Sequence, residues 1–144
     1  MSTTAQTVFE QAMRLMGEVD ATGATDITDN AEYKNRTLGL LSILQAECYP
    51  ISDAYAAATS GIRPVLAPLT AFTSEIGLDD GICQAVLPYG LAAHLLLDEN
   101  ATIAAFFNER YEQLKNEFKS VPSEFVAIED IYGGIEYGSF AAWE

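Results

Sequence analysis

Basic residues are scarce in this chain. Its 144 residues include 7 lysines and arginines against 21 aspartates and glutamates, so the formal net charge is −14 at pH 7. A chain with this balance does not hold nucleic acid by neutralising phosphates, and it is an equally poor ligand for an anionic membrane surface. The charge has two readings: it keeps the protein dispersed in solution, or it forms a surface that lies near DNA without binding it.

Histidine and cysteine are nearly absent as well. His94 is the only histidine, and its apolar surroundings favour a hydrogen-bonded core or interface residue over a catalyst. Cys48 and Cys83 lack the close Cys or His spacing of a metal site, and we expect two free buried thiols rather than a disulfide. The sequence also lacks a glycine-rich phosphate loop and a Gly-x-Ser-x-Gly motif. It therefore predicts no enzyme, no cofactor and no metal site.

Long hydrophobic runs are missing. The longest strongly apolar stretch, Leu91 to Leu97, contains His94 and is far too short to span a bilayer. The first six residues have neither the basic start nor the apolar run of a signal peptide. We therefore expect a soluble protein, made in the cytoplasm, with no membrane partner.

The sequence is rich in helical patterns. Apolar residues make up 49% of the chain, and many are alanine, the best helix former. Apolar side chains recur at helical spacing in four segments, which predicts an all-α fold, a small helical bundle. We expect Asp29 and Glu32 to form a capping box on the second helix, and Asn100 to cap the fourth. The expected main helices are 4–19, 29–49, 79–97 and 101–120.

The last two of these helices are the expected centre of the bundle. The short turn at Asp98–Asn100 makes them antiparallel. The helix over 79–97 is apolar around most of its circumference, so it is buried centrally or covered by a partner. Pro88 removes one amide from its hydrogen-bond ladder. Because the apolar stripe keeps its phase across the proline, we predict a kink between Gln84 and Pro88 rather than two helices.

The segment 50–77 interrupts the helical pattern with Pro50, Pro64 and Pro68. Residues 62–72 have an extended pattern. A long irregular segment in a small domain is often functional or lies along a neighbouring molecule. A loop folded over its own core explains the segment equally well, so both readings stay open.

The C-terminal residues 122–144 are predicted to form an arm that follows a helical bundle domain of residues 1–121. The arm has five acidic residues and no basic one, yet it is too aromatic for a solvated tail. It either packs back on its own domain or docks on another subunit. We favour docking by an extended arm, in which Ile131–Glu136 has the pattern of a small hairpin. The expected interface residues are Phe125, Ile128, Ile131, Tyr132, Ile135, Tyr137, Phe140 and Trp143.

Two runs in the third and fourth helices carry a family resemblance. Residues 80–93 read Asp-Gly-Ile-Cys-Gln-Ala-Val-Leu-Pro-Tyr-Gly-Leu-Ala-Ala, and residues 106–114 read Phe-Phe-Asn-Glu-Arg-Tyr-Glu-Gln-Leu. In a mostly helical domain, these runs resemble the head-to-tail adaptor, or connector, family of tailed bacteriophages. Members are helical and form a ring, commonly of twelve subunits, below the portal. Their extended segments grip the portal and neighbouring subunits, and DNA passes through the central channel.

The resemblance implies a structural virion protein of the phage neck, synthesised in the host cytoplasm. The implied partners are other copies of the chain, the portal protein and the next neck or tail protein. DNA would pass through the acidic channel without specific binding, and the family has no catalytic residues. Two alternatives stay open: another neck or tail-completion protein, and a small acidic interaction module that mimics DNA and binds a basic protein.

Overall fold

The prediction of a small all-α bundle is confirmed. The computed structural model describes residues 2–52 and 66–120, and in these ranges it contains helices but no strand. The expectations for residues 53–65 and for the arm, 122–144, lie outside the described residues. The main helices are α1 (Ala5–Met16), α2 (Ala31–Cys48), α3 (Asp80–Ala85), α4 (Leu87–Leu96) and α5 (Ala101–Ser120), with short 3-10 turns η1 (Thr28–Asn30) and η2 (Tyr49–Ile51).

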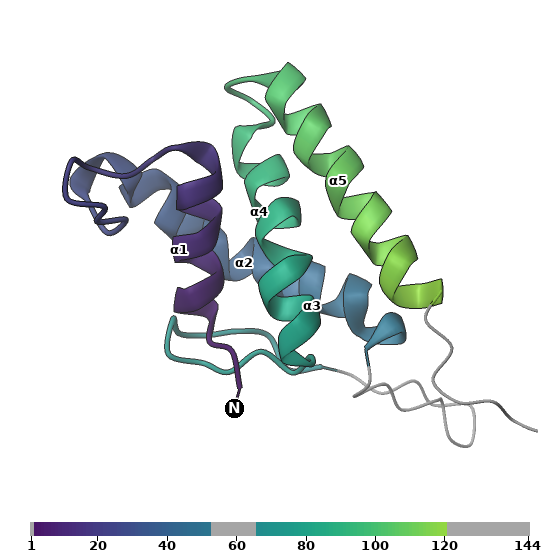
Figure 1. The fold of residues 1–144 in the computed structure, drawn as a ribbon. Helices are drawn as coiled ribbons and strands as arrows, with labels where there is room; N and C mark the ends of the chain where they lie inside the picture. The colour runs from purple at the N-terminus through teal and green to yellow at the C-terminus, as the bar shows by residue number, and fades with distance from the viewer. Residues whose placement is uncertain (1, 53–65, 121–144) are drawn as a thin grey trace, which may run out of the picture.

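Helix α4 is the centre of the bundle. Helices α1, α4 and α5 lie side by side, α5 runs antiparallel to α4, and α2 passes behind them in the view of Figure 1. Helix α4 packs against α1, α2, α3 and α5. Eight of its ten residues are buried, including Leu87, Leu91 and Leu95. The nearly all-round apolar surface of this helix is therefore covered by its own domain.

The predicted helix over 79–97 is interrupted at Val86. The backbone of Val86 stays in the right-handed helical region, with φ of −100° and ψ of −50°, but the structure divides the segment there into α3 and α4. The amide of Val86 still donates to the Ile82 carbonyl at 2.9 Å, and the Val86 carbonyl accepts from Gly90 at 3.3 Å. The interruption lies between Gln84 and Pro88, as predicted. The expectation of one continuous kinked helix is wrong, because Pro88 has no amide to donate to Gln84.

Both ends of α1 follow from local chemistry. The Thr4 hydroxyl accepts a hydrogen bond from the amide of Thr7, which caps the first turn. Gly17 ends the helix with φ of +76°, a left-handed conformation that glycine adopts without strain. The helix is therefore shorter than the predicted 4–19, and Val19 lies beyond it, partly exposed.

The predicted capping box on α2 is wrong. Asp29 lies in the 3-10 turn η1, α2 begins at Ala31, and the helix has no side-chain cap. Asn30 has a different role. Its buried amide donates to the carbonyls of Glu18 at 2.7 Å and Thr25 at 2.8 Å. The side chain that precedes α2 thus fastens the loop between α1 and α2 instead of capping the helix.

Residues 66–77 fold over their own domain. The Gln45 side chain on α2 donates to the Ala67 carbonyl and accepts from the Gly77 amide at 2.9 Å. The Ser42 hydroxyl accepts from the Leu69 amide at 2.9 Å. At its other edge this segment pairs with the N-terminus, where the Ile76 amide donates to the Thr3 carbonyl. For this part of the irregular segment, the reading of a loop that covers its own core is confirmed.

Candidate interaction surfaces

The predicted arm interface lies outside the described residues. None of its eight residues, from Phe125 to Trp143, is placed by the structure. The structure does describe the bundle. Its notable features are polar contacts between helices, a group of exposed apolar side chains and a groove over α4.

The described residues offer no metal site. In the ranges 2–52 and 66–120, no group of three or more His, Cys, Asp or Glu side chains lies close enough to hold an ion. Cys48 and Cys83 are free and buried, as predicted. Burial raises the pKa of the Cys83 thiol to about 12, helped by the charges of Asp79 and Asp80. A thiol with so high a pKa is neutral at pH 7 and is a poor nucleophile.

A buried polar contact joins α2 to α5. The Cys48 thiol and the Tyr111 hydroxyl lie 3.4 Å apart, and burial raises the pKa of both groups. The Lys115 ammonium lies 4.6 Å from the centre of the Tyr111 ring and binds the carboxylates of Glu47 and Glu112. Burial opposes the charge on Lys115, but its hydrogen bonds to the two carboxylates outweigh burial and raise its pKa. This cluster stabilises the packing of the helices.

A second polar cluster ties α2 to the turn between α4 and α5. The Tyr33 hydroxyl donates to the Glu99 carboxylate. Arg36 donates to the backbone carbonyl of His94 at 3.2 Å and forms an ion pair with Asp98 at 3.7 Å. Lys34, close by on α2, forms an ion pair with Asp26 at 3.0 Å. His94 itself lies half-buried beside a cavity between α4 and α5.

Large apolar side chains are exposed where α4 turns into α5. Leu97 is 64% exposed and Phe106 is 63% exposed. Ile103 is 43% exposed, and its spacing of three residues from Phe106 places both on one face of α5. An aromatic and two aliphatic side chains in water at one end of a small domain are typical of a protein contact.

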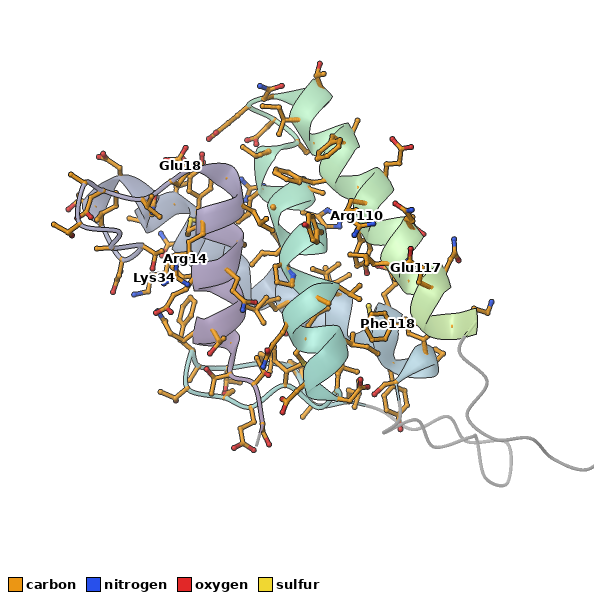
Figure 2. All side chains as sticks on the ribbon, viewed as in Figure 1. Arg14, Glu18, Lys34, Arg110, Glu117 and Phe118 are labelled. Carbon is orange, nitrogen blue, oxygen red and sulfur yellow. The ribbon has the colours of Figure 1, made fainter. Side chains whose placement is uncertain are left out.

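A groove lies over α4 between α1 and α5. It has a volume of about 500 Å³. Figure 2 shows Arg14 on α1 and Arg110 on α5, the two helices that flank α4. The lining residues are Gln11, Arg14, Leu15, Gln84, Ala85, Pro88, Tyr89, Arg110 and Leu114.

The two arginines of the groove use only part of their hydrogen-bonding capacity within the domain. Arg14 lies 4.0 Å from the Glu10 carboxylate and its side chain is 57% exposed. Arg110 donates one bond to the Gln113 amide oxygen at 3.1 Å, although a guanidinium has five donors. The amide oxygen of Gln11 is buried and accepts no hydrogen bond from the described residues. The groove therefore offers positive charge and an apolar floor.

Sequence reasoning did not find this groove. The one usable signal was that Arg14 and Arg110 are two of only seven basic residues. Their convergence depends on how α1 packs beside α4 and α5, which helical periodicity does not specify.

Comparison of the chain with protein-family models, with curated proteins and with solved structures gives no match. Among the described residues, no helix combines the length and the apolar character needed to cross a membrane.

Proposed function

We propose that this chain is a structural protein of a tailed-bacteriophage virion, a head-to-tail adaptor. Its copies form a ring, commonly of twelve subunits, below the portal. The ring bridges the portal to the next neck or tail protein, and DNA passes through its channel without specific binding. Another neck or tail-completion protein would assemble in the same way at a different position.

The observation that carries this function is the exposed apolar end of the bundle. Leu97, Ile103 and Phe106 remain in water although the domain has an extensive core of its own. Burying such side chains against a neighbour stabilises a complex by roughly 25 cal/mol per Å² of apolar surface. An assembly protein needs a contact surface of this kind.

The charges of the bundle support passage of DNA. Lys34, Arg36 and Lys115 each form an ion pair with a carboxylate of the same domain. Cations engaged in this way are poor ligands for phosphate, and the net charge of −14 repels a polyanion. A channel lined by such subunits lets DNA move without trapping it.

The decisive experiment mixes the purified chain with the portal protein of the phage that carries it. Mass measurement and negative-stain microscopy should show a ring of this protein on the portal. A chain that stays monomeric and ignores the portal would overturn the adaptor function. The chain alone is a weaker test, because an adaptor need not form a ring before it meets its portal.

Two variants locate the contacts. Phe106→Glu should abolish ring formation on the portal while the helical circular dichroism signal is retained. The matched control is Asn116→Glu, which adds the same charge at another exposed position of α5. Deletion of 122–144 should also prevent docking, and normal docking of the truncated chain would refute a role for the arm.

The net charge of −14 favours one competing function, a small acidic module that mimics DNA. Such a module would be a monomer or dimer, would ignore the portal and would bind a basic protein with strong salt dependence. The same portal experiment therefore separates the two functions.

A further inference from the structure

The groove over α4 has the chemistry of a binding site for an acidic, apolar peptide. Its floor is formed by Pro88 and Tyr89, and its walls by residues of α1 and α5. A volume of about 500 Å³ accommodates a few side chains rather than a folded partner. Arg14 and Arg110 supply positive charge on opposite walls, in a chain with only 7 basic residues.

We propose that the groove holds the C-terminal segment of the same molecule, with Ile128-Glu129-Asp130-Ile131-Tyr132 as the docked residues. The two carboxylates face Arg14 and Arg110, and the flanking apolar side chains cover the floor. The segment 122–144 as a whole has five acidic residues and no basic one, so its charge is complementary to that of the two arginines in the groove.

The connection to α5 brings the segment to the groove. Arg110 and Leu114 line the groove, and α5 ends at Ser120. At 1.5 Å per residue, the end of the helix is about 15 Å beyond Arg110. The eight residues from there to Ile128 reach about 26 Å when extended, which is enough to turn back. A peptide tethered this closely has an effective concentration of about 1 mM, so it outcompetes other copies in dilute solution. The inference concerns the free chain and does not depend on ring formation.

The test uses hydrogen exchange with mass spectrometry on the full-length chain. Amides of residues 126–134 should exchange at least about tenfold more slowly than an unstructured peptide. The double variant Arg14→Glu, Arg110→Glu should remove this protection, because it places four carboxylates together. Lys119→Glu, a single charge reversal on α5 outside the groove, should leave it unchanged. Circular dichroism confirms that the variants stay folded.

A charge exchange makes the test specific. Adding Glu129→Lys and Asp130→Lys to the double arginine variant should restore the protection. The inference is overturned if residues 126–134 are unprotected in the native chain, if the arginine variants keep the protection, or if the exchanged charges fail to restore it. Protection that appears only at high protein concentration would place the segment on a second copy and would also overturn it. If the arginine variants unfold, the native chain alone tests the inference. Salt should weaken the protection of residues 126–134, and protection that does not respond to salt would overturn it.

Discussion

The ring of Tyr111 on α5 lies directly against the backbone of Gly90 on α4. A β-carbon at Gly90 would be 2.9 Å from Cε2 of Tyr111 and 3.2 Å from Cδ2 of Leu44. Tyr111 is one of the largest fully buried side chains, so its ring has little room to move. The two antiparallel helices approach as closely as they do because residue 90 has no side chain.

Gly90→Ala should therefore destabilise the fold, although alanine is the better helix former. Overpacking of a core costs about 1–3 kcal/mol, which exceeds the gain of up to ~1 kcal/mol from helix propensity. Urea unfolding followed by circular dichroism measures the difference. Gly39→Ala is the matched control, since Gly39 is exposed in α2 and nothing lies within 4 Å of its added β-carbon. That variant should be more stable than the native chain, and a stabilised Gly90→Ala would contradict the packing.

Asn30→Asp should be strongly destabilising at neutral pH. The buried Asn30 amide donates to the carbonyls of Glu18 and Thr25, and an aspartate carboxylate would present an acceptor to both. The expected loss is about 2–3 kcal/mol. Burial beside two carbonyls would raise the pKa of the new carboxyl, so stability should recover as the pH falls and the group becomes protonated.

Unfolding of the Asn30→Asp variant at a series of pH values below neutrality checks this recovery. Asn35→Asp makes the same chemical change at an exposed position of α2 and should have little effect. Equal stability of the two variants at pH 7 would show that the Asn30 bonds are not needed.

Lys115→Met should weaken the contact between α2 and α5. The Lys115 side chain is only 16% exposed and binds Glu47 at 2.5 Å and Glu112 at 3.1 Å. Removing the ammonium leaves the Glu47 carboxylate without this partner and should cost about 1 kcal/mol. Thermal unfolding measures the loss, and Lys119→Met, at an exposed position of the same helix, is the control. An equal loss in both variants, or no loss in Lys115→Met, would contradict this role of the Lys115 ammonium.

Stability should fall as the pH rises above about 9. The ordinary pKa of the Cys83 thiol is 9.0, and in the folded chain it is about 12. Between these values the unfolded chain has lost a proton that the folded chain retains, so the contribution of the thiol is complete below pH 9 and decreases towards pH 12. Cys83→Ala should reduce the slope of the unfolding free energy by about 1.4 kcal/mol per pH unit in this range.

The pH prediction is checked by urea unfolding of both proteins at a series of alkaline pH values. Part of the slope should remain in the variant, because burial also raises the pKa of Cys48, Tyr33 and Tyr111. Identical slopes for the native chain and Cys83→Ala would contradict the assigned burial of the thiol.

The elements of this fold were predictable where one local signal dominates. Helical periodicity indicated all four helical segments, and the Asn100 side chain caps α5 through the Ile103 amide as expected. The site of the break before Pro88 follows from the missing proline amide alone. These features depend on neighbours in the sequence.

Features that depend on tertiary contacts were not predictable. Asp29 and Glu32 have the spacing of a capping box, yet Asn30 finds two carbonyls in the preceding loop and the chain enters α2 through a 3-10 turn instead. The tight contact of Gly90 with the Tyr111 ring of α5 likewise depends on how the two helices pack and not on neighbours in the sequence. The groove between Arg14 and Arg110 likewise exists only after α1 and α5 have packed on either side of α4.

The contact of α1 with α4 also sets the order in which the chain can fold during synthesis. The apolar face of α1, with Val8, Phe9 and Met13 fully buried, packs against α4, a helix that the ribosome completes roughly 80 residues later. At ~5–20 residues per second, the newly made α1 waits for several seconds or more with that face unmatched. The N-terminal helix is thus the part of the nascent chain with the greatest need of a chaperone or of rapid translation.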